Sequence, residues 1–254
     1  MYPTLFRLGS FDITSFGVMV ALGAVIGILV LRHEMTRAGL DGGRGLDAAL
    51  VGVLGGLAGA KLLYVVEHWA EPLSETLFSR GGMSWFGGFT GGVAAGLAMV
   101  AYSRLPLMGV LSAATPALAI GQAVGRIGCF LVGDDYGRPT SLPWGIAFPE
   151  GLPPTTARVH PTQLYEFASL VAITGVLLAL RRRGTPDRTV VAAYLILAGG
   201  MRFLVEMVRV NQVVAFGLTT AQVFSVALVV AGLSLAVKSG KAQPAPAAAK
   251  RARR

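Results

Sequence analysis

The chain has 254 residues, of which 54% are hydrophobic and only 14% are charged, and its mean hydropathy is +0.63. Soluble domains carry roughly 25% charged residues, so the composition excludes an ordinary soluble globule and indicates one polytopic membrane domain. The net charge of +9 suggests nucleic-acid binding as a function. The basic residues lie between apolar segments and in a tail, however, and this distribution excludes that function. One cysteine excludes an intramolecular disulfide, a zinc finger and an iron–sulfur site, and three histidines argue against a histidine-rich metal site.

Seven apolar segments are long enough for a membrane helix, which needs about 20 mostly apolar residues. They cover residues 15–32, 47–66, 84–102, 108–128, 161–180, 189–208 and 218–237. The fourth is the weakest, because it carries Ser, Thr, Pro and Gln. The N-terminus is not typical of a cleavable signal peptide, since Arg7 and Asp12 precede the first apolar run and a basic loop follows it. The sequence therefore predicts an all-α protein with seven transmembrane helices.

Basic residues follow the first, third, fifth and seventh segments, and this asymmetry marks the cytoplasmic side of the membrane. We therefore expect the N-terminus outside and the C-terminus inside. The last residues, 238–254, are rich in Pro, Ala and cationic side chains. That composition predicts a disordered cytoplasmic tail that contacts anionic lipid.

Glycines recur in the second and third segments at the spacing of close helix packing. They are Gly52, Gly55, Gly56 and Gly59 in one segment and Gly87, Gly88, Gly91, Gly92 and Gly96 in the other. We expect most of them to be structural. Gly87 and Gly88 lie near the outer surface, where a bare backbone could also contact a lipid headgroup.

The sixth segment contains charged residues, which are costly within a membrane and therefore candidates for function. Arg202 and Glu206 are four residues apart and share a helix face, and Arg209 lies three residues further on nearly the same face. Two readings stay open. The three residues form a structural salt bridge, or they form an anion site in which Glu206 orients an arginine for bidentate phosphate binding.

Two further polar clusters lie on the same side. GRIGCFLVGDDYGRPT, at residues 125–140, begins with an arginine among glycines, where we expect non-helical backbone lining a wet cavity or buried in protein. HPTQLYE, at residues 160–166, opens the fifth segment, and its histidine is either a helix cap or a catalytic group. Together the clusters predict a cavity in the outer leaflet that binds an anionic amphiphile. Its five defining side chains are Arg126, Asp134, His160, Arg202 and Glu206.

The three motifs, in this order, resemble those of the bacterial prolipoprotein diacylglyceryl transferases, and the similarity covers residues 15–237. GGMSWFGGFTGG, at residues 81–92, resembles the glycine-rich motif of the same family. The resemblance implies seven membrane helices, a periplasmic N-terminus and periplasmic catalytic loops at residues 67–83 and 129–160 of one domain, residues 1–237. It implies transfer of the diacylglyceryl group of phosphatidylglycerol to the lipobox cysteine of a preprolipoprotein, with release of glycerol phosphate. It implies no metal or cofactor.

The resemblance also assigns roles to single residues. Arg126 matches an arginine near the lipid phosphate, Arg202 and Glu206 match an essential pair, and Asp134 stands where many members have glutamate. The substrate-binding candidates are Gly137, Arg138, Arg209, Cys129, Gly87, Gly88, Phe16, Phe86, Gln163 and Tyr165. The chain departs from the family pattern at three of them. Cys129 replaces an asparagine of many members, Phe86 a histidine and Phe16 a tyrosine.

The implied reaction is an alkyl transfer, in which a thiolate attacks the glycerol carbon that carries the phosphate ester and the C–O bond breaks. Arg126 and Arg202 are expected to stabilise the negative charge that develops on the leaving phosphate. Asp134, Glu206 and His160 remain alternatives for deprotonating the thiol. The nucleophilic sulfur belongs to the substrate, so we expect Cys129 to be a small buried apolar residue.

Two alternatives remain. Phe16 and Phe86 motivate a divergent family member without this activity, and the intramembrane charges motivate a lipid or solute transporter, although the sequence shows no internal repeat. The expected partners of the enzyme are phosphatidylglycerol, the preprolipoprotein signal peptide and the lipid bilayer, with no nucleic acid. We expect a monomer in the bacterial inner membrane.

Overall fold

The computed structural model describes residues 2–8, 11–78, 82–215 and 217–240. The chain divides into two compact units. Met1–Ala24 and Leu118–Arg254 form the large unit, and Val25–Ala117 form the small unit.

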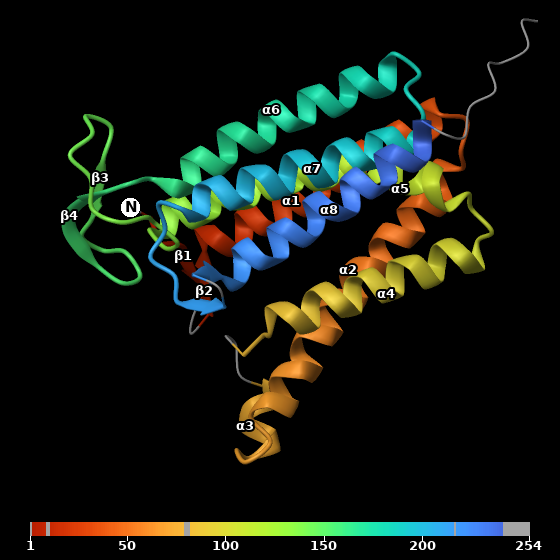
Figure 1. Ribbon diagram of the computed structural model, residues 1–254. Helices are drawn as coiled ribbons and strands as arrows, with labels where there is room; N and C mark the ends of the chain where they lie inside the picture. Colours follow the sequence, from red (N-terminus) through yellow and green to blue (C-terminus); the bar gives the residue numbers. More distant parts are fainter. Residues whose placement is uncertain (1, 9–10, 79–81, 216, 241–254) are drawn as a thin grey trace, which may run out of the picture. The chain divides into compact units, whose positions relative to one another are not determined.

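Long apolar runs form helices, and the loops between them form short antiparallel hairpins (Figure 1). The helices are α1 (Ser15–Arg37), α2 (Gly42–Glu67), α3 (Leu73–Phe78), α4 (Trp85–Tyr102), α5 (Leu107–Val132), α6 (Thr162–Arg182), α7 (Asp187–Glu206) and α8 (Thr220–Gly240). The strands are β1 (Thr4–Leu8), β2 (Phe11–Thr14), β3 (Ile146–Phe148), β4 (Thr155–Val159), β5 (Val213–Ala215) and β6 (Leu218–Thr219). The prediction of an all-α protein missed these three hairpins, because each has fewer than six residues per strand and no long alternating pattern.

Six helices, α1, α2, α5, α6, α7 and α8, are long and apolar enough to cross a membrane. The third predicted segment corresponds to α4, whose apolar part, Phe86–Tyr102, is shorter than the other six. A helical multi-pass membrane protein is therefore confirmed, and a seventh crossing stays a prediction. The tail predicted to be disordered lies, from residue 241 onward, outside the described residues.

Two helix ends differ from the sequence prediction. The fourth segment was expected to end near residue 128 in irregular backbone, but α5 continues to Val132 with Pro116 inside it. Arg126, which the predicted segment 108–128 includes, therefore lies on a helix, and the irregular backbone expected around it begins only after Val132. The sixth segment was expected to reach residue 208, but α7 ends at Glu206. Arg209 lies beyond the helix and not on its face.

In the small unit, α2 and α4 run antiparallel at very short distance, as the glycine spacing predicted (Figure 1). A Cβ atom on Gly91 would lie 3.0 Å from the Cα of Gly59, and one on Gly55 would lie 3.0 Å from the carbonyl oxygen of Gly91. The backbones thus meet without side chains between them. Leu31, Met35 and Val110 belong to the hydrophobic core of this unit.

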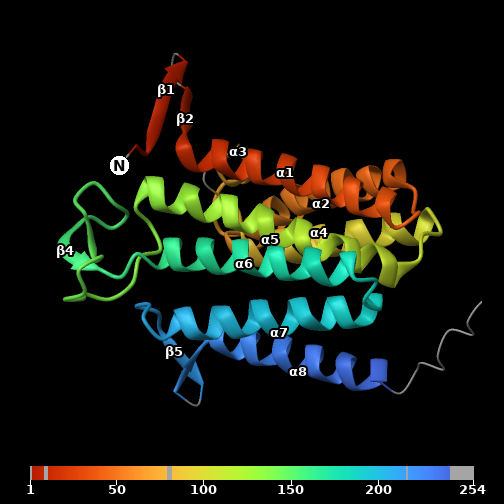
Figure 2. The same ribbon diagram turned by 90° about the horizontal axis from the view of Figure 1, so that it is seen from above.

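In the large unit, α6, α7 and α8 lie side by side with the second half of α5 (Figure 2). Ala123 of α5, Leu170 and Leu177 of α6 and Val190 of α7 form its buried core. The pair α7 and α8 also approaches closely, since a Cβ atom on Gly199 would lie 2.9 Å from the carbonyl oxygen of Ser225. This packing fixes the ends of the helices relative to one another.

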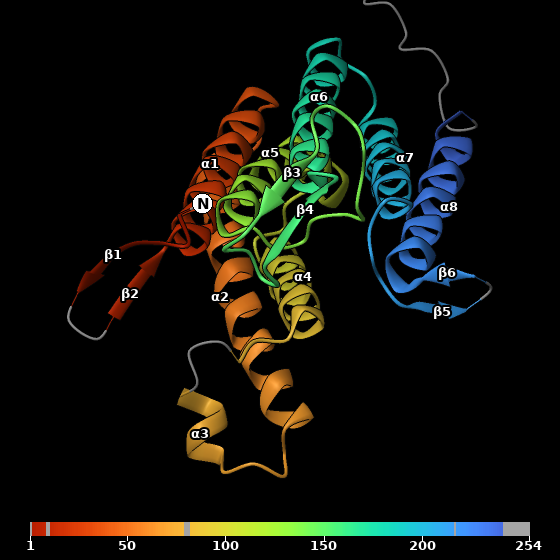
Figure 3. The ribbon, with the colours of Figure 1, turned by 90° about the vertical axis from the view of Figure 1, so that its left-hand side faces the viewer.

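The loop between α5 and α6 folds across one end of these helices and carries the β3–β4 hairpin (Figure 3). Phe148, which is buried, stacks on Tyr136 with ring centroids 5.4 Å apart and meets the ring of Phe130 on α5 edge-on at 5.9 Å. Gly137 forms an isolated bridge to Arg209 just beyond α7. The end of α5, the start of α6 and the end of α7 are thereby joined at one place.

Candidate functional site

Three arginines and three carboxylates meet where α5 ends, α6 begins and α7 ends. They form one continuous set of ion pairs, which we call the arginine cluster. Its members are Arg126, Asp135, Glu166, Arg202, Glu206 and Arg209. All six belong to the large unit. Of the five side chains that the sequence predicts to converge, Arg126, Arg202 and Glu206 belong to this cluster, whereas Asp134 and His160 form no ion pair with it among the described residues.

Glu166 lies at the centre of the arginine cluster. Its Oε2 pairs with the Nε of Arg126, and its Oε1 lies 3.1 Å from Nη1 of Arg202 and 3.5 Å from Nη1 of Arg209. The carboxylate is only 2% exposed. One buried anion therefore holds three guanidinium groups together, which compensates for its removal from water.

Glu206 fixes the other side of Arg202. Its Oε2 lies 2.8 Å from Nη2 of Arg202, and its side chain is fully buried. Its Oε1 accepts hydrogen bonds from Oγ1 of Thr219 at 2.8 Å and from Nδ2 of Asn211 at 2.5 Å. The pairing of Arg202 with Glu206, which their spacing of four residues indicated, is therefore present and tied to the β5–β6 hairpin.

Asp135 connects Arg126 and Arg209. Its Oδ2 lies 2.9 Å from Nη1 of Arg126, and its Oδ1 pairs with Nη2 of Arg209. Its backbone has a φ of 61°, in the left-handed region that Asp tolerates better than most residues. Burial alone would raise the pKa of Asp135, but the positive charges of Arg209 and Arg126 outweigh burial and lower it.

Asp134, the predicted catalytic carboxylate, points elsewhere. Among the described residues it pairs with no arginine, and its carboxylate lies near Sγ of Cys129. Burial, and next the charge of Asp135, raises the pKa of Asp134. The amide of Gln163, a predicted site residue that is buried, donates to the backbone oxygen of Asp134 at 2.5 Å. Gln163 thus holds the loop and leaves the Asp134 carboxylate at the edge of the cluster.

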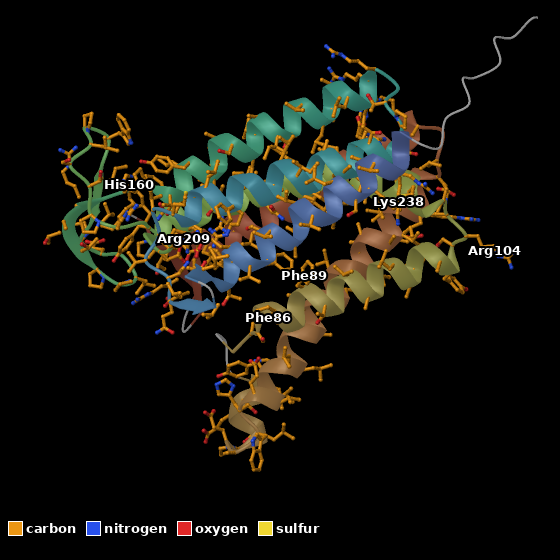
Figure 4. All side chains as sticks on the ribbon, in the orientation of Figure 1. Phe86, Phe89, Arg104, His160, Arg209 and Lys238 are labelled. Atoms are coloured by element: carbon orange, nitrogen blue, oxygen red, sulfur yellow. The ribbon has the colours of Figure 1, made fainter. Side chains whose placement is uncertain are left out.

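His160 forms a separate hydrogen-bonded group with Tyr165. Nδ1 of His160 lies 3.2 Å from the hydroxyl of Tyr165, which also accepts a hydrogen bond from Nε1 of Trp144 at 2.8 Å. In the part of the chain that the structure describes, no ion pair joins the ring to the arginine cluster. His160 and Arg209 nevertheless lie at the same end of the large unit (Figure 4).

Gly137 is where the chain passes tightly between two segments. A Cβ atom there would lie 2.5 Å from the carbonyl oxygen of Val208 and 2.9 Å from Cβ of His160, so only glycine fits. The close approach brings Arg209 to the cluster. The neighbouring Arg138 has an exposed side chain, while its backbone N–H donates to Val208 at 2.8 Å.

The positions that depart from the family pattern have different surroundings. Cys129 is buried, as expected, and its Sγ lies 3.9 Å from Nη1 of Arg126. Phe16 is exposed beside Gly128 of α5. Phe86, also exposed, belongs to the small unit together with Gly87 and Gly88 (Figure 4). There Gly87 packs against α2, which is a structural role.

Sequence reasoning overlooked two members of the cluster as site residues. Glu166 ends the HPTQLYE motif and is a charge within the first turns of an apolar helix, a signal that marks a functional candidate. Asp135 carried no such signal, because only the left-handed backbone turns its side chain toward Arg126 and Arg209.

The fold and the arginine cluster define a helical multi-pass membrane protein with a site of arginines and carboxylates at one end of its helices. The family model described as prolipoprotein diacylglyceryl transferase matches residues 3–238. The chain belongs to this family.

Relatives support the assignment along nearly the whole chain. The phosphatidylglycerol–prolipoprotein diacylglyceryl transferase of Methylobacillus flagellatus is 34% identical, covering 93% of this chain and 96% of its own length. The enzymes of the same name from Clostridioides difficile and Geobacter sulfurreducens are 32% and 31% identical. They cover 90% and 96% of this chain and 91% and 97% of their own lengths, respectively.

Proposed function

We propose that this protein transfers the diacylglyceryl group of phosphatidylglycerol to the lipobox cysteine of preprolipoproteins, forming a thioether and releasing glycerol phosphate. The observation that carries the proposal is the arginine cluster, in which Glu166 holds Arg126, Arg202 and Arg209 around one point. The family and the names of its relatives supply the two substrates.

The chemistry assigns the arginines to the leaving phosphate. The substrate thiolate forms a bond to the glycerol carbon, the C–O bond to the phosphate breaks, and the phosphate keeps the electron pair. Arg126 and Arg202 are already braced by Glu166 and Glu206, so they need no reorganisation as negative charge develops. Bringing lipid and thiol together in one cavity lowers the barrier further.

Asp134 is the best candidate for the base that accepts the thiol proton. Its pKa is raised, which makes its carboxylate a stronger base, and no arginine holds it within the described residues. Glu206 forms an ion pair with Arg202 through Oε2 and accepts hydrogen bonds from Asn211 and Thr219 at Oε1. His160 is bonded to Tyr165.

We further infer seven membrane crossings in one catalytic domain, residues 1–237, with a periplasmic N-terminus and a cytoplasmic tail from residue 238. In the large unit, Arg209 and His160 lie at one end and Lys238 at the opposite end, where the excess of positive charge marks the cytoplasm (Figure 4). This supports a periplasmic position for the arginine cluster and for loop 129–160 of the large unit, and we propose that loop 67–83 of the small unit is periplasmic as well. We propose that the enzyme acts as a monomer in the bacterial inner membrane.

The test is a mass measurement on a model peptide. The purified protein in detergent is mixed with phosphatidylglycerol and a lipobox peptide that carries a single cysteine. A gain of one diacylglyceryl unit, absent when the peptide cysteine is changed to serine, is the expected result. No gain, while a known active transferase succeeds in parallel, would overturn the proposal and indicate a divergent member of the family.

A further inference from the structure

Asp135 holds the two arginines in the way a phosphate would. Each of its carboxylate oxygens pairs with a different guanidinium, Oδ2 with Arg126 and Oδ1 with Arg209. A phosphodiester offers the same pattern, since it carries one negative charge spread over two non-bridging oxygens, and arginine pairs with both kinds of anion.

The balance of charge requires one carboxylate to leave when an anion enters. The arginine cluster contains three arginines and three carboxylates, so its formal charges cancel. An added phosphodiester would give the cluster a net negative charge beside the buried carboxylates Glu166 and Glu206, which is costly. Exchanging one monoanion for another keeps the charges balanced.

Of the three carboxylates, only Asp135 is free to leave. The side chains of Glu166 and Glu206 are 2% and 0% exposed, and each is held by several donors, whereas that of Asp135 is 42% exposed. Within the described residues, only Arg126 and Arg209 bind the Asp135 side chain, while its backbone oxygen accepts a hydrogen bond from Oγ1 of Thr162 at 2.6 Å. The side chain can therefore rotate outward while the loop stays in place.

We propose that Asp135 occupies the part of the phosphate position beside Arg126 and Arg209, and that the phosphodiester of the incoming phospholipid displaces it. Asp135 is then a positioning residue. It keeps Arg126 and Arg209 at a separation that suits two anionic oxygens, and its return competes with the released glycerol phosphate. The inference rests on the proposed transferase function for the identity of the anion, but its anion-binding part can be measured separately.

The first experiment measures binding and needs no transfer. Glycerol 1-phosphate is titrated calorimetrically into the detergent-solubilised wild type and into Asp135→Asn. The neutral variant lacks a competing anion, so we expect a dissociation constant about fivefold lower, the factor appropriate to one half-exposed ion pair. Glu150→Gln, which removes an exposed carboxylate from the same loop, is the matched control and should bind as the wild type does.

The second experiment separates binding from chemistry in the transfer assay. We expect Asp135→Asn to lower the KM for phosphatidylglycerol and the inhibition constant of glycerol 1-phosphate, each about fivefold, without raising kcat. Asp135→Ser, also neutral but smaller, repeats both measurements if the asparagine variant does not fold.

The outcomes distinguish the two proposals. Unchanged or weaker binding of glycerol 1-phosphate by a folded, neutral variant would overturn the displacement of Asp135, whatever the wild type catalyses. Tighter binding in a protein that transfers no lipid would support displacement and overturn the transferase function.

Discussion

Glu166 is the side chain on which the arginine cluster depends most, because all three arginines contact it. It comes from the second turn of α6, whereas its partners come from α5, from α7 and from the segment after α7. A pair of residues on one helix, such as Arg202 and Glu206, can be found from their spacing alone. Contacts between helices depend on packing, which the spacing of residues along the chain does not contain.

Removing the charge of Glu166 should affect both stability and activity. Glu166→Gln leaves three arginines facing two carboxylates, and an uncompensated buried charge costs roughly 3 kcal/mol. We expect a lower thermal unfolding temperature in detergent and loss of transfer. Glu150→Gln should change neither. An unfolding temperature equal to that of the wild type would contradict the central role of Glu166.

Removing either arginine that faces the leaving phosphate should abolish transfer. For Arg126→Ala and Arg202→Ala we expect at least a hundredfold loss of kcat, the order of magnitude for removing one preorganised donor. The measurement is the peptide mass assay, with membrane insertion followed by immunoblotting of the membrane fraction. Near-normal turnover of an inserted variant would refute the role of the arginines in binding the phosphate.

The ion pairs of Asp135 should stabilise the protein down to low pH. The pKa of Asp135 is lowered by Arg209 and Arg126 against the effect of burial, so its ion pairs stabilise the fold above the ordinary pKa of about 3.9 and are lost as the pH falls through the lowered value. The difference in unfolding temperature between the wild type and Asp135→Asn should therefore persist at pH 5 and close only below about pH 4. A difference that closes near pH 6 would exclude these pairs as its source.

At the scale of elements, the helices were predictable because apolar runs of this length have few other stable structures in a membrane. The ends of the helices were harder to predict. The sequence prediction extended the helix past Glu206, but the chain turns there, and the Gly137 bridge then places Arg209. The β3–β4 hairpin was missed because its order comes from Phe148 packing on Tyr136, not from a local pattern.

The glycine contact between α2 and α4 should tolerate no side chain. Gly91→Ala would place a Cβ atom 3.0 Å from the Cα of Gly59, so we expect a destabilisation of about 1–3 kcal/mol from overpacking. Gly175→Ala is the matched control, because its Cβ atom would meet no atom within 4 Å in the described structure. Both are measured by thermal unfolding in detergent. Equal unfolding temperatures would contradict the tight contact.

At the scale of the whole molecule, we infer the orientation from the distribution of charge. A phosphatase that is active only in the periplasm should be inactive when fused after residue 238, because the fusion stays in the cytoplasm. A single cysteine introduced at residue 150 should react with a thiol reagent that cannot cross the membrane. The native cysteine, Cys129, is buried and should therefore give a low background reaction with the thiol reagent. A cysteine at residue 150 that reacts only after permeabilisation would reverse the proposed topology.

The shared burial of Glu166 and its arginines also has a consequence for biogenesis. Chain synthesis delivers Arg126 to the bilayer 40 positions before Glu166, and Arg202 a further 36 positions later. A lone arginine in lipid is costly unless it reaches toward the headgroups, which its place in the last two turns of α5 allows. We therefore expect the end of α5 to stay near the interface, with Arg126 hydrated, until α6 and α7 have been inserted and the ion pairs can form.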